Sequence, residues 1–226
     1  MCSELDEKYK KNLIKRIGFL HGIEITERMI QAFVNVPREE FVLERDRNSA
    51  YIDSPRPILA GQTISAIHMV VMYISPSLAN PKEGDIVLEV GAGSGYNAAL
   101  FAEMVAPRGS TNPGHVYALE IIPDLVDFAR ENIERTGYSD RVTIVHADGG
   151  IGYPEKAPFD IISVAAASKE VPKPLEKQLK VGGRMIIPVG TTFFQELILI
   201  KKEKGEKFSQ RNICGVRFVP LTGKFG

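Results

Sequence analysis

The segment that most constrains the fold of this chain is a short apolar run that stops at a glycine-rich loop. Residues 86–90 read IVLEV and are typical of a buried strand, and Gly91, Gly93 and Gly95 follow at alternate positions before a helix-compatible run at 97–106. Glycine is needed where the backbone turns sharply or approaches a ligand closely, because it has no Cβ. A strand, a glycine loop and a helix N-terminus together predict a site for a nucleotide-bearing molecule, with a simple tight turn as the alternative.

The spacing of the glycines narrows the class of ligand. In the dinucleotide fingerprint GxGxxG the third glycine would stand one position after Gly95. The pattern here is ExGxGxG, and it begins at Glu89 inside the end of the strand. A carboxylate there would repel a pyrophosphate but would attract a cationic amino-acid group. The pattern therefore favours S-adenosylmethionine, whose methionine end carries an ammonium and a sulfonium, over the nicotinamide cofactor of an oxidoreductase.

Composition excludes several classes of protein. The chain has 226 residues with 28 basic and 28 acidic side chains, so its neutral net charge does not indicate a nucleic-acid partner. Cys2 and Cys214 cannot form a disulfide framework, and His21, His68 and His115 show no metal-ligand spacing, so no metal site is expected. A charged N-terminus and the lack of a long apolar run predict a cytoplasmic protein without a membrane partner.

Alternation of strand and helix patterns from residue 84 onward predicts the fold class. We expect an α/β, doubly wound, Rossmann-like sheet of about seven strands, whose last two strands form an antiparallel hairpin around Gly205. One compact domain would combine a helical and loop region, 1–80, with a catalytic region, 81–226. The expected strands are 85–90, 115–119, 142–146, 159–164, 183–189, 194–202 and 211–219; the expected helices are 4–20, 26–34, 65–75, 95–106, 123–136 and 172–179, with 35–63 mostly loop.

Two further strands of the expected sheet end in polar residues. In a doubly wound sheet, ligands lie beyond the carboxyl ends of the strands. Glu120 ends the second strand and would accept hydrogen bonds from two ribose hydroxyls. Asp148 follows the third strand and would accept from the exocyclic amine of adenine, while Gly149 lets the backbone approach the ring. Helix capping or a solvated loop is the alternative for both acids, and His146 is expected to be packed or solvated.

Several motifs together resemble one enzyme family over nearly the whole chain. They are YIDSP at 51–55, GQTIS at 61–65, LEVGAGSGY at 88–96, Asp148-Gly149, LKVGGRMIIPVG at 179–190 and VRFVPLTG at 216–223. The chain resembles the protein-L-isoaspartate O-methyltransferases. The glycine loop is shared with many methyltransferases and indicates only the cofactor, whereas GQTIS and its order relative to the other motifs are much more specific.

The resemblance implies an enzyme that repairs aged proteins. Such enzymes methylate the free α-carboxylate of an L-isoaspartyl residue from S-adenosylmethionine, releasing S-adenosylhomocysteine, and the ester then closes to a succinimide that partly returns to aspartate. The alternatives are a methyltransferase acting on RNA or a small molecule, and a non-catalytic module that only binds these ligands. A monomer acting on isoaspartyl proteins and peptides is expected.

The resemblance also assigns residues to the site. Ser65 is expected to be catalytic, orienting the carboxylate by a neutral hydrogen bond; capping of the following helix is the alternative for Ser65 and Thr63. The expected substrate-binding residues are Asp53, Ser65, Val219 and Pro220. The expected cofactor-binding residues are Gln62, Thr63, Ile64, Glu89, Gly91, Gly93, Ser94, Gly95, Glu120, Asp148, Gly149 and Thr222.

Overall fold

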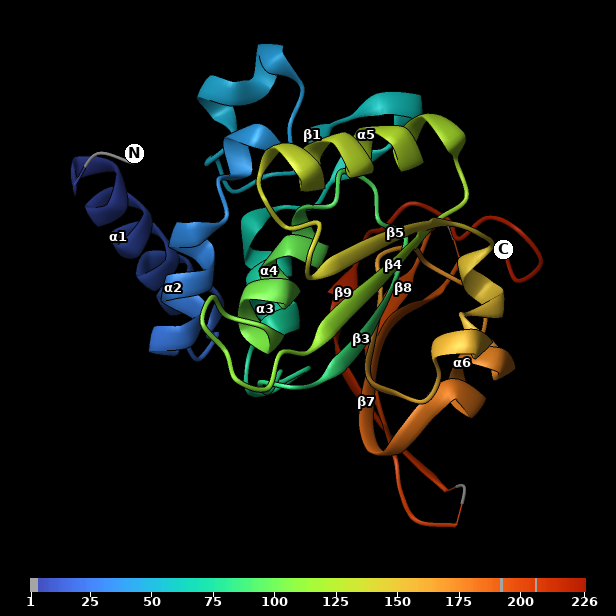
Figure 1. The fold of residues 1–226 in the computed structure, drawn as a ribbon. Coiled ribbons are helices and arrows are strands. Elements are labelled where there is room, and N and C mark those ends of the chain that lie inside the picture. Colours follow the sequence, from blue (N-terminus) through green and yellow to red (C-terminus); the bar gives the residue numbers. More distant parts are fainter. Residues whose placement is uncertain (1–3, 192, 206) are drawn as a thin grey trace.

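A seven-stranded sheet forms the centre of the molecule (Figure 1). The computed structural model describes residues 4–191, 193–205 and 207–226; Cys2 lies outside this part of the chain. The strand order is β5-β4-β3-β6-β7-β8-β9, parallel from β5 to β7 and antiparallel across β8 and β9. The strands are β3 (Ile86–Val90), β4 (His115–Glu120), β5 (Val142–His146), β6 (Phe159–Val164), β7 (Leu179–Gly190), β8 (Gln195–Lys202) and β9 (Phe208–Val216). The predicted fold class and C-terminal hairpin are confirmed.

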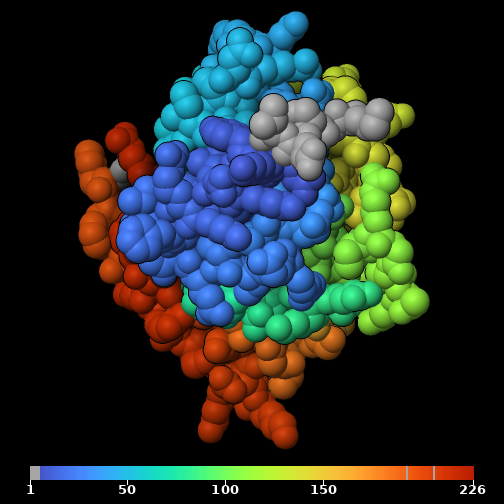
Figure 2. All heavy atoms as spheres, turned by 90° about the vertical axis from the view of Figure 1, so that its left-hand side faces the viewer, coloured from blue at the N-terminus to red at the C-terminus, as the bar shows by residue number. Residues whose placement is uncertain are grey.

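Helices cover both faces of the sheet. Helices α1 to α5 pack on one face and α6 on the other, so that the N-terminal region forms an outer layer over α4. Figure 2 shows α1 and α2 in blue as the surface of this layer. The helices are α1 (Glu4–His21), α2 (Glu27–Asn35), α3 (Ile67–Ile74), α4 (Tyr96–Val105), α5 (Pro123–Arg135) and α6 (Lys173–Gln178). None of the helices in the described ranges has the length and apolar character needed to cross a membrane.

Period-two burial in β3 explains why this strand lies in the middle. Val87 packs into the core beneath α4, and Leu88 packs into the core on the opposite face; both are completely buried. Successive side chains of a strand point to opposite faces, so a run that is apolar at both parities must be covered on both sides. Glu89 shares the parity of Val87 and therefore points toward α4.

The region expected to be mostly loop contains short regular elements. β1 (Arg56–Pro57) pairs antiparallel with β2 (Thr63–Ile64), and 3₁₀ turns occupy Arg38–Glu40, Glu44–Ser49 and Leu59–Gly61. These elements are two to six residues long, and periodicity over such short runs gives no signal. The expected loop is therefore corrected to a chain of short turns and a small hairpin.

The largest differences from the expected boundaries are in α3, β7 and β9: β7 begins at Leu179 rather than at residue 183, and β9 begins at Phe208 rather than at residue 211. α3 begins at Ile67 rather than near Ser65, because residues 63–64 are drawn into the hairpin with β1. β9 ends at Val216, so the expected strand does not continue to residue 219. The C-terminal segment instead turns to the end of β6, where Ala167 N donates to Val219 O at 2.8 Å and Leu221 N donates to Ala167 O at 2.7 Å. Tertiary contacts with β6 therefore replace continued pairing with β8.

Candidate active site

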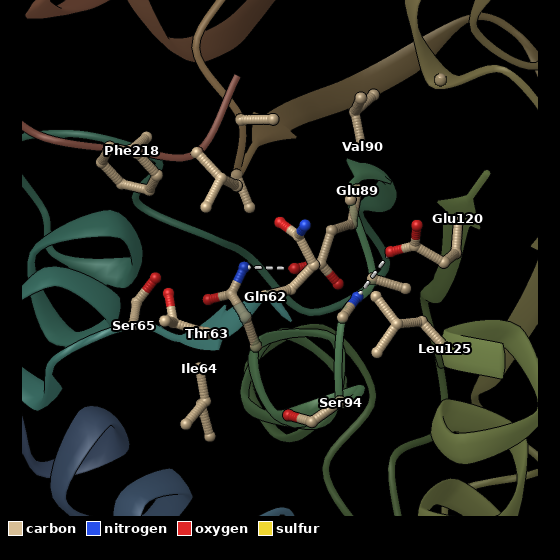
Figure 3. Close-up of a pocket in the computed structure, with 18 of the residues that line it drawn as sticks. Gln62, Thr63, Ile64, Ser65, Glu89, Val90, Ser94, Glu120, Leu125 and Phe218 are labelled. Atoms are coloured by element: carbon tan, nitrogen blue, oxygen red, sulfur yellow. Dashed lines mark hydrogen bonds between the residues drawn. The ribbon is translucent and has the colours of Figure 1, made fainter. Parts of the chain in front are cut away.

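A cleft that is partly open to solvent lies beyond the carboxyl ends of β3, β4 and β6. The strand order reverses direction at β3, which is where ligands bind in doubly wound sheets. Figure 3 shows Ser65, Glu89 and Glu120 around this one space. The predicted site residues that line the cleft are Gln62, Thr63, Ile64, Ser65, Glu89, Gly91, Gly93, Ser94, Glu120, Gly149, Val219, Pro220 and Thr222. Asp53, Gly95 and Asp148 are not part of its lining.

The glycine loop has a backbone that only glycine adopts readily. The φ angles of Gly91, Gly93 and Gly95 are 87°, 55° and 85°, all in the left-handed region. Gly95 is the N-cap of α4, and a Cβ there would meet Ile133 of α5 at 3.2 Å. The role of Gly95 in this structure is therefore to let the loop turn and α4 pack against α5; its predicted contact with a cofactor stays a prediction.

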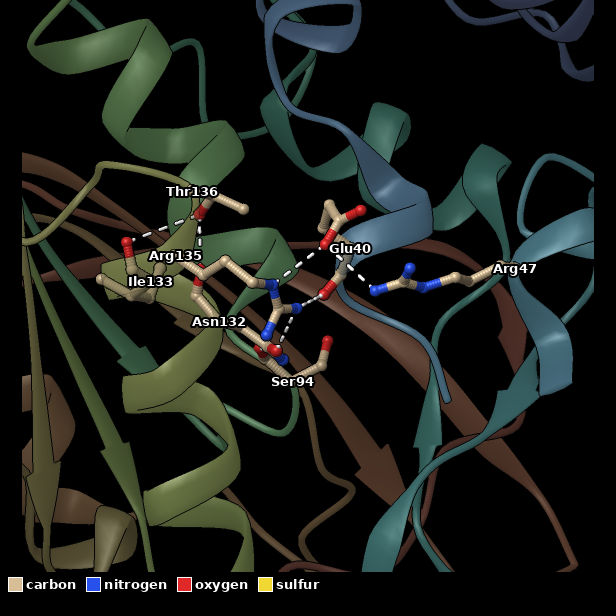
Figure 4. A network of polar contacts seen from close by, with 7 residues as sticks. All are labelled: Glu40, Arg47, Ser94, Asn132, Ile133, Arg135 and Thr136. Atoms are coloured by element: carbon tan, nitrogen blue, oxygen red, sulfur yellow. Dashed lines mark hydrogen bonds and ion pairs between the residues drawn. The ribbon is translucent and has the colours of Figure 1, made fainter. Parts of the chain in front are cut away.

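A polar network attaches the glycine loop to α5 and to the N-terminal region (Figure 4). Asn132 is completely buried and donates from Nδ2 to Ser94 O at 2.9 Å, and its Oδ1 accepts from Arg135 Nη2 at 2.9 Å. Arg135 Nε also donates to Glu40 Oε2 at 2.9 Å, and Arg47 reaches the same oxygen at 3.2 Å. The network joins segments 95 residues apart, so the loop position depends on the fold as a whole.

Glu89 presents a buried carboxyl oxygen to the cleft. Its Oε1 accepts from Asn97 Nδ2 at 2.7 Å, and its Oε2 is buried without a hydrogen-bond partner. Burial raises the pKa of Glu89 to about 8, a shift that the Asn97 hydrogen bond opposes and the nearby Glu120 charge adds to. An unsatisfied buried acceptor is costly, and an ammonium donor would satisfy it. The environment of Glu89 thus fits the cationic end of S-adenosylmethionine.

Glu120 lies against the backbone of the glycine loop. Its Oε2 accepts from Gly93 N at 2.9 Å, and its Oε1 accepts from Ile121 N at 2.9 Å and Ile122 N at 3.1 Å. These bonds fix a carboxylate that is only 6% exposed but still lines the cleft. A carboxylate has lone pairs beyond these three bonds, so ribose hydroxyls can still donate to it. The alternative of a solvated loop acid is excluded by its burial.

Asp148 is engaged by other parts of the protein. Its Oδ1 accepts from Gly150 N at 2.9 Å, which caps a 3₁₀ turn at Gly149–Ile151, and its Oδ2 accepts from Lys224 N at 2.8 Å. The capping alternative therefore describes what its side chain does here, and its predicted contact with adenine stays a prediction. Gly149 lines the cleft, and a Cβ there would lie 2.4 Å from Val90 Cγ1.

Ser65 lies at the opposite end of the cleft from Glu120 (Figure 3). It precedes α3, whose N-cap is Ala66 and carries no side-chain cap. The capping alternative for Ser65 is therefore not realised, and Thr63 belongs to β2. Capping is done by Asp53, whose Oδ1 accepts from His68 N at 2.9 Å. The predicted contact of Asp53 with a peptide stays a prediction.

Asp53 also gathers two histidines that are far apart in the sequence. His68 Nδ1 lies 2.9 Å from its Oδ1, and His21 Nε2 lies 3.2 Å from its Oδ2. The ligand atoms of the three residues lie within 4.8 Å of one another, a grouping that their sequence spacing did not indicate. The two imidazoles are stacked at 4.3 Å with an interplanar angle of 12°. One ion cannot lie in the planes of two parallel stacked rings, so this geometry is that of a hydrogen-bonded cluster.

The cleft also has a lining that motif analysis did not select. Tyr73, Asn97, Leu125 and Phe218 contribute to it. Phe218 is held by Gln195, which donates to its carbonyl oxygen at 3.1 Å and accepts from its N–H at 2.6 Å. Tyr73, Asn97 and Leu125 come from ordinary helix sequence, so only their position in the folded chain identifies them, whereas Phe218 lies within the motif VRFVPLTG.

Comparison with known proteins agrees with this geometry. A sequence model of the family described as protein-L-isoaspartate(D-aspartate) O-methyltransferase matches residues 8–226. The chain is 49% identical over 213 residues to the protein-L-isoaspartate O-methyltransferase of Staphylothermus marinus, covering 94% of this chain and 92% of the relative. It is 45% identical over 226 residues to that of Pyrococcus abyssi, covering 99% and 98%.

Solved structures show the same fold. A protein-L-isoaspartate O-methyltransferase superposes with a TM-score of 0.83 at 28% identity, covering 96% of this chain and 67% of the other. A Plasmodium falciparum protein, described as a putative protein-L-isoaspartate O-methyltransferase in complex with S-adenosyl-L-homocysteine, gives a TM-score of 0.79 at 30% identity, covering 94% and 97%. The match extends over both the N-terminal layer and the sheet. The chain belongs to the protein-L-isoaspartate(D-aspartate) O-methyltransferase family.

Proposed function

We propose that this protein transfers the methyl group of S-adenosylmethionine to the free α-carboxylate of L-isoaspartyl residues in damaged proteins and peptides. The observation that carries the proposal is the placement of Ser65 and Glu89 around one cleft, with a neutral hydroxyl on one side and a buried acid on the other. Membership of the family supports the acceptor.

The cofactor would be held by residues from five segments. The free oxygen of Glu89 suits the ammonium, and Glu120 suits the ribose hydroxyls. Gly149 and the neighbouring Asp148 would contact the adenine. The backbone of the glycine loop would approach the cofactor closely at Gly91, Gly93, Ser94 and Gly95. The cofactor would be covered by the segments that carry Gln62, Thr63, Ile64 and Thr222. The Plasmodium falciparum relative, whose structure is a complex with S-adenosyl-L-homocysteine, supports this choice of cofactor.

The protein's contribution to the reaction is alignment. A carboxylate is ionised at neutral pH, so no general base is required. The sulfonium supplies an activated methyl group when the cofactor is bound. Ser65 would donate its O–H to one carboxylate oxygen and direct the other along the line of the sulfur–methyl bond. A carbon–oxygen bond forms, the carbon–sulfur bond breaks with its electron pair going to sulfur, and the products are a methyl ester and S-adenosylhomocysteine.

The fate of the ester explains repair. The following backbone nitrogen attacks the ester carbonyl, methanol leaves, and the resulting succinimide hydrolyses in part to a normal aspartyl bond. The acceptor is defined by a backbone defect, so the protein needs backbone contacts more than side-chain pockets. Val219 and Pro220 lie in the cleft lining and could supply such contacts, together with the predicted Asp53. We infer that residues 1–80 help to close the site.

We also propose an oligomeric state and a location for the protein. A monomer without nucleic-acid or membrane partners, located in the cytoplasm, is consistent with the neutral net charge of the chain. Size-exclusion chromatography with light scattering would test the monomer, and fractionation of the source cells would test the location.

Methyl transfer to matched peptides tests the proposed function directly. The protein is incubated with S-adenosylmethionine labelled in its methyl group and with two peptides that differ only in containing isoaspartate or normal aspartate. Base-labile label on the isoaspartyl peptide alone is the expected result. Label on neither peptide, with S-adenosylhomocysteine binding intact, would redirect the search to an RNA or small-molecule acceptor.

A further inference from the structure

Arg38 is a completely buried cation that contacts no carboxylate within the described part of the chain. Its Nε donates to Ala50 O at 2.8 Å, and its Nη2 donates to Ser65 O at 2.7 Å. Its guanidinium carbon lies 4.8 Å from the centre of the Tyr96 ring. Its Nη1 is buried without a hydrogen-bond partner.

Burial of the Arg38 charge without an ionic partner lowers the stability of the folded protein. Buried charges in proteins are normally paired, because the desolvation of an unpaired ion is large. Burial lowers the pKa of Arg38, a shift that the neighbouring Tyr96, Tyr51 and Asp53 oppose. An arginine still keeps its proton in a protein, so a positive charge remains at this position. Two carbonyl oxygens and an aromatic face stabilise that charge only in part.

Within the described part of the chain, the lining of the cleft in front of Arg38 supplies no positive charge of its own. Its lining in the described chain contains the acids Glu89 and Glu120 but no lysine, arginine or histidine. A carboxylate acceptor entering this space would meet two acids. Arg38 holds the backbone of Ser65 and stacks on Tyr96, and both residues line the cleft. Its charge therefore lies directly behind the wall at which the acceptor is proposed to bind.

We propose that Arg38 is a positioning residue that sets the specificity of the cleft for a carboxylate acceptor. The inference rests on the proposed function and adds the group that recognises the acceptor's charge. Arg38 lowers the electrostatic energy of a carboxylate at Ser65 without forming an ion pair with it. A direct ion pair would stabilise the ground state of the nucleophile, whereas a charge behind the wall attracts the anion and leaves its oxygens free to react.

The fork of the guanidinium adds a geometric role. Arg38 joins the carbonyl of Ala50, which begins the segment carrying Asp53, to the carbonyl of Ser65. A lysine retains the charge but cannot bridge two carbonyls in fixed directions. The charge and the geometry can therefore be separated by two substitutions, Arg38→Met and Arg38→Lys.

Arg184 provides a matched control. It is half-buried and donates to two carbonyl oxygens, Pro76 O at 3.2 Å and Leu78 O at 2.7 Å, at a position outside the cleft lining. Arg184→Met therefore removes the same kind of contact away from the site. It is expected to lower thermal stability and to leave kinetic constants unchanged.

The test compares a charged with a neutral acceptor in each variant. Each protein is assayed with an isoaspartyl peptide as substrate, and with the same peptide carrying an α-carboxamide in place of the free α-carboxylate as a competitive inhibitor. Arg38→Met should raise KM for the isoaspartyl peptide about tenfold, while the inhibition constant of the carboxamide changes less than about threefold. Arg38→Lys should restore most of the KM and retain a lower kcat, and the dissociation constant of S-adenosylhomocysteine should stay within about threefold in all variants.

The outcomes separate this inference from the proposed function. No turnover of the isoaspartyl peptide by the unsubstituted protein would reject the proposed function itself. Normal turnover, with KM and the carboxamide constant rising equally in Arg38→Met, would reduce Arg38 to a structural role. If Arg38→Met does not fold, Arg38→Lys decides the matter: a loss of discrimination between the two peptides as large as that expected for Arg38→Met would overturn the assignment of charge.

Discussion

Two acids in the same cleft have opposite environments. Glu120 accepts three backbone hydrogen bonds, two at Oε1 and one at Oε2. Glu89 accepts a single neutral amide donor at one oxygen and leaves the other buried without a partner. We expect Glu120 to accept from neutral hydroxyl donors, and Glu89 to accept from a cation that completes its hydrogen bonding. In the proposed complex, Glu120 would bind the ribose of the cofactor and Glu89 would bind its ammonium.

Ser65→Ala should impair chemistry more than cofactor binding. The substitution removes the hydroxyl that would orient the acceptor, and misplacement of a reacting atom is expected to reduce kcat by about 10- to 100-fold. The dissociation constant of S-adenosylhomocysteine, measured by calorimetry, should change by less than about threefold because the cofactor contacts remain. Unchanged turnover of an isoaspartyl peptide would remove Ser65 from the catalytic role.

Glu89 is protonated in the ligand-free protein below about pH 8, so the affinity for S-adenosylhomocysteine should increase as the pH is raised toward that value. Binding of an ammonium favours ionised Glu89, so protons are released on binding over this range. Calorimetry in buffers of different ionisation enthalpy measures that release. Glu89→Gln should bind more weakly and release fewer protons, and an equal release in both proteins would contradict the assignment.

The same carboxyl makes the ligand-free protein less stable at high pH. Burial raises the folded-state pKa of Glu89 from 4.5 to about 8. Its contribution to stability is therefore fully present below about pH 4.5 and is lost as the pH rises through about 8. The difference in unfolding free energy between Glu89→Gln and the unsubstituted protein, measured by urea titration, should shift in favour of Glu89→Gln over this range. A difference that does not vary with pH would contradict the raised pKa.

Elements around the cleft are held by side chains distant in sequence. α3 has no cap of its own, and Asp53 supplies one through the backbone N–H of His68. The glycine loop is held from α5 by Asn132. Asp53 thus positions the segment with Ser65, and Asn132 positions the glycine loop. The two segments come together only when the N-terminal layer packs on α4 and α5.

Asp53→Ala should weaken α3 and displace Ser65. Loss of a helix cap costs about 1 kcal/mol, which corresponds to a decrease in Tm of about 2–4 °C for a chain of this size. Burial raises the pKa of Asp53, but hydrogen bonds from His68 outweigh it, so the net pKa lies below its usual value. Its contribution to stability is therefore present above its unfolded pKa and is lost as the pH falls through the folded value. Scanning calorimetry at neutral and acidic pH measures the decrease in Tm and its dependence on pH. An equal Tm difference between the two proteins at every pH would contradict the lowered pKa of Asp53, and the absence of any difference would contradict its capping role.

Three parts of the chain together form the walls of the cleft. The sheet supplies the glycine loop and the acids, the N-terminal region supplies Ser65, and the C-terminal segment supplies residues from Phe218 to Thr222. A ligand in this space contacts all three parts at once. Its binding energy should therefore appear as stability of the complete fold rather than of one element.

S-adenosylhomocysteine should raise the Tm of the protein in proportion to the logarithm of its concentration. At a concentration of about 100 times the dissociation constant, the expected stabilisation is about 2.7 kcal/mol, or about 5–10 °C in Tm. Glu120→Ala should lose most of this shift at the same concentration, because the ribose contact is removed. An unaltered shift, measured by differential scanning fluorimetry, would contradict the ribose assignment of Glu120.

Local patterns were sufficient for the sheet and the glycine loop. Strands such as β5 and β6 coincide with their expected bounds, because each is an apolar run delimited by polar or turn residues. The meeting of the glycine loop with Glu89 and Glu120 at one cleft also follows from the sequence, since the carboxyl ends of parallel strands share one edge of a sheet. The motifs that carry the family resemblance are themselves short and local.

Only the tertiary structure decided how the site is supported. Arg38, Asn132 and the cluster of Asp53 with His21 and His68 act through contacts that span 15 to 38 residues of sequence, and no periodicity marks such pairs. The engagement of Asp148 by the C-terminal segment likewise depends on where residue 224 folds back. A side chain's type and spacing determine which element it joins, but burial and partners depend on the packing of distant elements. For this reason the sequence determined the fold class and the chemistry of the cleft, whereas the structure alone revealed the buried charge behind Ser65.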